Sequence, residues 1–407
     1  MAVPEIGGRI MAYDLAAHPF FFVDPALAGK IFSPEENQGD GTLAAWKNYG
    51  GDKTWPAPQG WEQDDQWHGP PDPVLDTGRY IVVTCEYKSH YAQIVMVSPP
   101  DPRTGVQITR QFRLERATSR VAVTLRFRNI AERPIRWSIW DVVQLDASLV
   151  TAQGVKSFDP SCVVTTPLNP HSRFPQGYKV MFGADDNPQW QVDGGLFRAS
   201  YQWQIGKVGI DSTAGWIAFC QASQAMAFAT RFSVEPGAEY PDDGATVECW
   251  TIGAGQVANL DYADSGIYLM ETEVLGPLVT LAPGDETVLE LEWGCCRCAG
   301  PIVDVQEAGC SSQGLALTRS DNEVRLTGSF GVFDAGELIL IWRDEAGAEI
   351  GRASLGAVDP LHPVVLDRAA RASAVHAELS VVATADGASR LLATTVTDAQ
   401  RLSSSVA

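Results

Sequence analysis

The chain has 407 residues, 45% of them hydrophobic, which is enough for two or three domains with cores of their own. Its formal charge of −20 argues against nucleic acid and anionic membranes as partners, because both are bound through basic patches. No apolar run reaches the roughly 18 residues of a membrane span. The start of the chain lacks the basic and apolar segments of a signal peptide. The compartment stays open, since a removed leader would be compatible with a periplasmic or secreted protein.

The stretch from Asn48 to His68 holds three of the twelve tryptophans, and its Gly and Pro residues predict a long ordered loop without helix or strand. Flat aromatic faces beside carboxylates, amides and a lysine suit a polyhydroxylated ligand, whose C–H faces stack on indole rings. The alternative is that these tryptophans only cap one end of a barrel or sandwich. The candidate ligand-binding side chains here are Tyr49, Lys53, Trp55, Trp61 and Trp67.

Further along the chain, the dominant pattern is alternation of apolar and polar residues with period two, which predicts β-strands. Convincing amphipathic helices are nearly absent. The sequence therefore predicts an all-β chain built as sandwiches or barrels. The expected strands are Ile81–Thr84, Ile94–Val97, Ile108–Leu114, Val121–Phe127, Ile135–Ile139 and Leu289–Trp293.

A change in composition at about Ala299 predicts a division into residues 1–298 and 299–407. Tryptophan and tyrosine are dense before it, whereas Trp342 is the only Trp or Tyr that follows. The second part shows short strands separated by turn residues, which suits a small immunoglobulin-like or fibronectin-like sandwich. Its expected strands are Glu323–Gly328, Glu337–Arg343, Val364–Leu366 and Ala377–Ala383, followed by a frayed tail from Thr397 to Ala407.

Eight cysteines are scattered along the chain, and only Cys295, Cys296, Cys298 and Cys310 form a cluster. In a strand, Cys296 and Cys298 would share one face while Cys295 points the other way. This arrangement favours buried thiols or one disulfide over a metal site, which needs four converging ligands. The chain also lacks a phosphate loop, a dinucleotide fingerprint and a zinc-protease motif, so we expect no cofactor and no metal.

Several stretches resemble the galactose-mutarotase-like (aldose 1-epimerase-like) superfamily, in an uncharacterised branch. They are Pro4–Ile10, Asn48–Gln59, Val106–Leu145, Tyr268–Pro277 and Leu281–Asp285. Over residues 4–298, the resemblance implies a large antiparallel β-supersandwich with a carbohydrate site on its concave face. The same fold serves epimerases, hydrolase and lyase domains and non-catalytic domains, so the fold leaves the reaction open.

The resemblance also implies an acid and a base. Epimerases of this fold use a histidine as general acid, within the central segment, and a glutamate as general base. Here the matching segment Ser138–Val142 has no histidine, and Trp140 or Asp141 stands in its place. In the closing strand, Glu271 and Glu273 are spaced to share one face.

Two histidines are therefore candidates for acid–base chemistry, because imidazole titrates near neutral pH. His68 follows two aspartates in the Trp-rich stretch, and the alternative is an exposed loop histidine. His90 lies beside Tyr91, as a lyase would require. Arg110 would neutralise a uronate, or else form a structural salt bridge.

Two hypotheses remain open. One is a carbohydrate-active protein that binds a mono- or oligosaccharide, possessing epimerase-, lyase- or hydrolase-type acid–base chemistry if it is an enzyme. The other is a non-catalytic saccharide-binding or assembly protein. They differ in whether His68 or His90 meets Glu271 or Glu273 around Trp55. Trp140 and Gln144 complete the expected binding residues, and the oligomeric state stays open.

Overall fold

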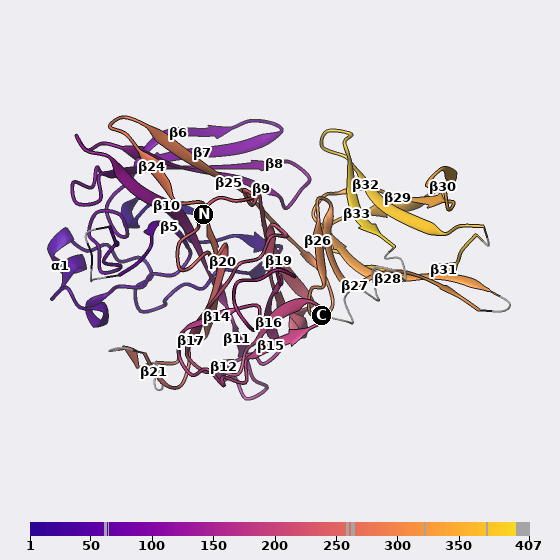
Figure 1. Cartoon of the computed structure of the whole chain (residues 1–407), viewed down its shortest axis with the longest axis horizontal. Helices are drawn as coiled ribbons and strands as arrows, with labels where there is room; N and C mark the ends of the chain where they lie inside the picture. Colours follow the sequence, from indigo (N-terminus) through magenta and orange to yellow (C-terminus); the bar gives the residue numbers. More distant parts are fainter. Residues whose placement is uncertain are drawn as a thin grey trace.

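The computed structural model describes residues 1–60, 63, 65–257, 260–261, 265–320, 323–371 and 373–395. In this part of the chain almost all regular structure is β (Figure 1). The helical elements described are α1 (Pro34–Gln38) and the 3-10 turns Pro4–Ile6, Leu43–Ala45 and Ala222–Gln224. None of the helices in the described residues is long and apolar enough to cross a membrane.

The first large sheet has nine antiparallel strands. Its order is β1 (Ala2–Val3), β2 (Arg9–Ile10), β5 (Asp52–Ala57), β10 (Ile135–Asp146), β23 (Leu269–Leu275), β20 (Val247–Thr251), β17 (Gly206–Ile210) and β14 (Lys179–Phe182), with β24 (Val279–Leu281) also paired to β10. The long strand β10 lies at its centre and pairs with β5 on one side and β23 on the other.

The second large sheet has ten antiparallel strands. Its order is β15 (Trp190–Asp193), β16 (Leu196–Ser200), β13 (Cys162–Pro167), β18 (Trp216–Gln221), β19 (Met226–Phe232), β25 (Glu286–Arg297), β9 (Val121–Asn129), β8 (Val106–Glu115), β7 (Tyr91–Val97) and β6 (Ile81–Tyr87). Small two-stranded sheets join Asp14–Leu15 to His18–Pro19, Ser148–Val150 to Lys156–Phe158, and Gln256–Val257 to Leu260–Asp261.

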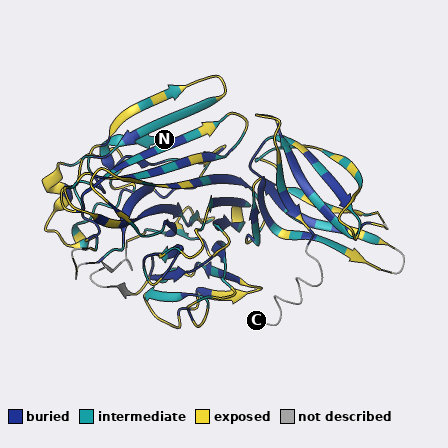
Figure 2. Ribbon diagram, turned by 45° about the horizontal axis from the view of Figure 1, so that its top comes forward, coloured by how far each residue is buried: buried dark blue, intermediate teal, exposed yellow. Residues whose placement is uncertain are grey.

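The two large sheets pack face to face and bury the alternating apolar residues between them. Val123, Leu125 and Phe127 of β9 are almost fully buried, as are Trp137 and Ile139 of β10. Figure 2 shows buried residues concentrated along the central strands. The predicted all-β supersandwich and the strands expected from alternation are confirmed.

The expectation that Asn48 to His68 is a loop throughout is wrong for its middle part. Asp52–Ala57 forms β5, an inner strand of the nine-stranded sheet, and all six residues are buried. A strand that is buried on both faces shows no polar–apolar alternation, and here Asp52 and Lys53 are buried because they find charged partners elsewhere.

The strands that follow Arg297 form two four-stranded sheets. One has the order β26 (Asp304–Gln306), β27 (Gly309–Arg319), β28 (Val324–Val332) and β31 (Val364–Ala369), and the other β30 (Glu349–Val358), β29 (Gly336–Arg343), β32 (His376–Ala383) and β33 (Ser389–Thr394). They share a core that includes Leu326, Phe330, Leu340 and Leu379. Division at residues 298 and 299, and an immunoglobulin-like topology, remain our predictions. The tail from 397 lies outside the described residues.

The cysteines are all free thiols, and seven are buried. Cys295 packs in the main core, whereas Cys296, Cys298 and Cys310 pack together in a separate cluster that also contains Cys220. The expected alternation in this segment is confirmed. Among the described residues, no group of His, Cys, Asp or Glu could hold a metal ion.

Candidate functional site

One face of the nine-stranded sheet carries charged and aromatic side chains where a sheet usually carries a simple apolar or solvated pattern. Strand register brings them together from five neighbouring strands. We call this the polar face, and its members are Lys53 and Trp55 of β5, Trp140 and Gln144 of β10, Glu271 and Glu273 of β23, Glu248 and Trp250 of β20, and Lys207 of β17.

The first half of the polar face is centred on Glu271. Its Oε1 accepts a hydrogen bond of 2.5 Å from Gln144 Nε2, and Lys53 Nζ lies 3.5 Å away. Burial lowers the pKa of Lys53 to about 8, although Glu271 partly opposes this shift. The side chain of Glu271 is 11% exposed, against 2% for Lys53, so solvent or a ligand reaches this pair from the carboxylate side.

The second half is centred on Lys207. Its Nζ lies 2.6 Å from Glu248 Oε2 and 3.0 Å from Glu273 Oε2, while Trp140 Nε1 donates to Glu273 over 2.9 Å. Burial raises the pKa of Glu248 well above its usual range and also raises the pKa of Glu273, while the charge of Lys207 opposes both shifts. Both glutamate side chains are fully buried.

The tryptophan rings beside Lys53 are held in place by a buried carboxylate. Asp76 accepts hydrogen bonds from Trp46 Nε1 at 2.8 Å and Trp55 Nε1 at 3.1 Å, and it forms an ion pair with Arg9. Arg9 also donates to the carbonyl of Gly50 over 3.0 Å. Lys53 Nζ lies 4.9 Å from the centre of the Trp55 ring, a cation–π contact.

The opposite face of the same strands carries a separate charged group in the core between the two large sheets. Arg110 of β8 pairs with Asp52, and its guanidinium also donates to the carbonyl of Gly8 over 2.6 Å. Burial, together with the neighbouring charge of Asp52, raises the pKa of Asp141 well above its usual range. Arg110 therefore forms the structural salt bridge that was the alternative to binding a uronate.

The structure does not bring the two candidate histidines to Glu271 or Glu273. His90 is exposed in the turn between β6 and β7, where its ring contacts Tyr91, and His68 is exposed and lines other cavities. Trp67 is fully buried and donates to Asp72 over 2.8 Å. Tyr49 is also buried, within a small cluster near the chain start. Trp61 lies outside the described residues.

Sequence reasoning missed four members of the site and its support: Arg9, Asp76, Lys207 and Glu248. Lys207 and Glu248 each stand in a short run of residues that are mostly apolar or glycine, and a lone charge in such a run requires a partner. That signal was available. The partners could not be deduced, because Lys207 and Glu273 are 66 residues apart.

The fold and the polar face define an all-β protein with a paired-charge, tryptophan-lined site on one sheet of a supersandwich. The chain belongs to the family described as Domain of unknown function (DUF4380), whose model matches residues 1–295. A search of curated proteins gave no match.

Solved structures with a similar course of the chain include proteins described as galactose mutarotase-like. One from Lactobacillus casei is 12% identical, covering 72% of this chain and 95% of its own, with a TM-score of 0.42. One from Clostridium acetobutylicum is 10% identical, with coverages of 73% and 91% and a TM-score of 0.43. A Synechocystis protein is 13% identical, with coverages of 73% and 91% and a TM-score of 0.44.

Proposed function

We propose that the polar face binds a saccharide and that Lys53 and Glu271 exchange protons with it. The observation that carries this proposal is the Lys53–Glu271 pair, in which a buried amine with a pKa of about 8 faces a partly accessible carboxylate. A group that titrates near neutral pH can both give and take a proton during one turnover.

The surroundings of the pair suit a polyhydroxylated ligand. The side-chain oxygen of Gln144 is buried without a hydrogen-bond partner among the described residues, which costs about 1–3 kcal/mol unless a donor meets it. A sugar hydroxyl would supply that donor, and Glu271 would accept a second one. The half-buried ring of Trp250, which pairs in register with Glu271, offers a flat apolar surface for the C–H face of the ring.

The charges favour a neutral sugar over a uronate at this position. Each of the two lysines already faces a carboxylate, because Lys53 pairs with Glu271 and Lys207 pairs with Glu273. The polar face therefore has no unpaired positive charge for the carboxylate of a uronate. Arg110 is paired with Asp52 on the other face of the sheet.

A second candidate function is saccharide binding or assembly without catalysis. It is favoured by the full burial of Glu248 and Glu273, which both lie against Lys207 Nζ. In that case these glutamates only fix the shape of the binding site and take no part in proton transfer.

The test is a panel of neutral mono- and oligosaccharides and uronates, measured for binding by calorimetry and for turnover by NMR of the anomeric protons. We expect a neutral sugar to bind, and Glu271→Gln to weaken that binding, while Glu290→Gln at an exposed position of β25 leaves it unchanged. Lys53→Met should abolish turnover. Binding without turnover across the panel supports the non-catalytic function, and absence of binding overturns both.

A further inference from the structure

A cavity of about 690 Å³ at one end of the nine-stranded sheet is lined by three arginines, in a chain with a formal charge of −20. Arg103 comes from the turn between β7 and β8, Arg133 from the turn between β9 and β10, and Arg136 from the start of β10. His68 lies in the same lining, and Asp65 is its one carboxylate among the residues described. Like charges gathered in this way repel each other unless an anion is present.

Two of these arginines have no carboxylate to neutralise them within the described part of the chain. Arg103 donates to the carbonyl of Gln66 over 3.3 Å, and Arg133 donates to the carbonyl of Arg103 over 3.1 Å. Both bonds use neutral backbone oxygens, so among the described residues neither guanidinium has a carboxylate partner within ion-pair distance. Arg136 pairs with Glu239, whose side chain is 68% exposed, so solvent weakens that pair.

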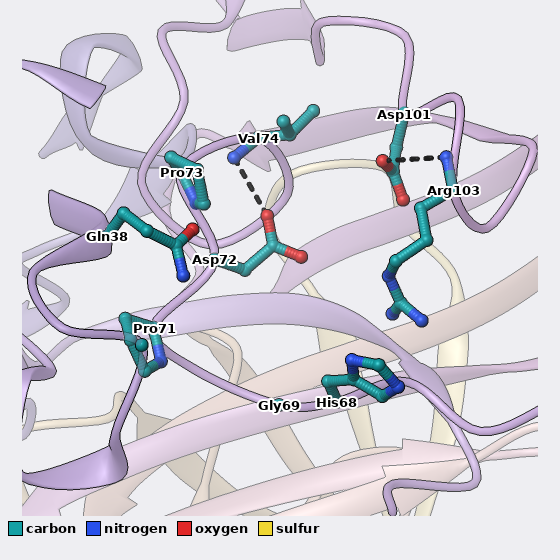
Figure 3. A pocket seen from close by; sticks show the side chains of 10 residues that line it. Gln38, His68, Gly69, Pro71, Asp72, Pro73, Val74, Asp101 and Arg103 are labelled. Atoms are coloured by element: carbon teal, nitrogen blue, oxygen red, sulfur yellow. Dashed lines mark hydrogen bonds between the residues drawn. The ribbon is translucent and has the colours of Figure 1, made fainter. Parts of the chain in front are cut away.

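A neighbouring cavity of about 320 Å³ shares His68 and Arg103 with the first one. Its two carboxylates already accept hydrogen bonds from other groups of the chain. Asp72 accepts from the indole of Trp67 and the backbone of Val74, and Asp101 accepts from Thr104. Figure 3 shows the guanidinium of Arg103 and the imidazole of His68 directed toward the same space. The N–H donors of Arg103 and His68 are therefore available to a ligand.

We propose that His68, Arg103, Arg133 and Arg136 form a binding site for an oxyanion, namely a sulfate, phosphate or carboxylate group. A guanidinium presents a planar fork of N–H donors that matches two oxygens of such a group. An oxyanion would offset the repulsion between these arginines and add charge-assisted hydrogen bonds to Arg103 and Arg133, which otherwise donate to backbone carbonyls.

The oxyanion site lies on the same sheet as the polar face but is separate from it. Arg136 and Trp140 share one face of β10, four residues apart, which is roughly 13 Å along a strand. The oxyanion is therefore either a free ion or a substituent on a longer ligand that extends along β10. The proposal does not depend on saccharide binding at Glu271.

The test is calorimetric titration of the full chain with sodium sulfate and sodium phosphate, against sodium chloride at matched ionic strength. We expect saturable binding of sulfate or phosphate that chloride does not reproduce. The double variant Arg103→Gln with Arg133→Gln should weaken it at least tenfold. Arg128→Gln removes the same charge from an exposed position of β9 that lines neither cavity, and should bind as the wild type does.

Further titrations with a sulfated, a uronate-containing and a neutral oligosaccharide distinguish the two sources of the oxyanion. Tenfold tighter binding of a charged oligosaccharide than of the inorganic ion identifies a substituent, and equal affinity identifies a free ion. The neutral oligosaccharide should bind the double variant unchanged, which separates this site from the polar face. Binding of sulfate and phosphate no stronger than chloride, or equal loss in Arg128→Gln, overturns the proposal. If the double variant fails to fold, Arg133→Gln alone replaces it.

Discussion

Lys53 and Glu271 are 218 residues apart in the chain, yet Lys53 Nζ lies 3.5 Å from Glu271 Oε1 across the central strand β10. The amine is buried more completely than the carboxylate, and its pKa falls to about 8. At neutral pH the buried Lys53 is charged, and burying that charge lowers the stability of the fold. This loss of stability disappears when the amine loses its proton.

The first prediction concerns this cost. Between pH 8 and 10.5 the unfolded chain holds the Lys53 proton and the folded chain does not, so stability rises with pH by up to about 1.4 kcal/mol per unit. Below pH 8 both states hold the proton and the slope vanishes. We therefore expect wild type to gain about 3 kcal/mol over Lys53→Met between pH 7.5 and 10.5 in urea unfolding.

The matched control for this titration is Lys30→Met, which removes an exposed lysine. The difference between wild type and the control should stay nearly constant over the same range. If the stability difference between wild type and Lys53→Met is equally independent of pH, burial does not destabilise the charged form of Lys53. That result would also argue against Lys53 as a proton donor.

The two glutamates that contact Lys207 should differ in how much they contribute to stability. Burial raises the pKa of Glu248 more strongly than that of Glu273, so replacing Glu248 by the neutral Gln should change stability by less than about 1 kcal/mol. Glu273 accepts from Trp140 and pairs with Lys207, so Glu273→Gln leaves a buried charge and should cost about 3 kcal/mol. Equal losses of stability in the two variants, on thermal and urea unfolding, would contradict this difference between the glutamates.

Much of the fold could be predicted from the sequence, because one-sided burial produces alternation. Val121–Phe127 is an example: its apolar residues face the core and its polar ones do not. The strand Asp52–Ala57 was missed because both of its faces are buried, and its charges are neutralised by Arg110 and Glu271. Local pattern carries no information about partners so distant in the chain.

Part of the candidate site could also be predicted, because residues two apart in a strand share one face. Lys53, Trp55, Trp140, Gln144, Glu271 and Glu273 meet on one face because register between β5, β10 and β23 aligns them. The spacing of Glu271 and Glu273 fixed their common face, whereas the distance of His68 from them depends on the course of a loop, which spacing does not determine.

The third prediction concerns the core charges behind the polar face. Burial raises the pKa of Asp141 more strongly than that of Asp52, so replacing Asp141 by the neutral Asn should be tolerated within about 1 kcal/mol. Asp52→Asn leaves the fully buried Arg110 without its counter-ion and should cost about 3–5 kcal/mol. Urea unfolding of both variants at pH 7 checks the difference, and a larger loss of stability in Asp141→Asn than in Asp52→Asn would contradict it.

The last prediction addresses how Trp46 and Trp55 are held beside Lys53. Asp76 accepts from both indole N–H groups and from Arg9, so Asp76→Asn removes the charge that organises all three. We expect a loss of about 3 kcal/mol in stability. We also expect a change in tryptophan fluorescence and at least tenfold weaker binding of the sugar that the panel identifies, measured well below the melting temperature.

Asp159→Asn is the control for a buried carboxylate elsewhere in the fold, since Asp159 accepts hydrogen bonds from Gln221 of β18 and from Ser223. It should lower stability and leave sugar binding unchanged. A milder variant, Trp46→Phe, keeps an aromatic ring but removes one hydrogen bond to Asp76, and should weaken binding less than Asp76→Asn does. If Asp76→Asn is destabilised but binds sugar as tightly as the wild type, the rings beside Lys53 only pack the protein, because disordering them would then leave the ligand's contacts intact.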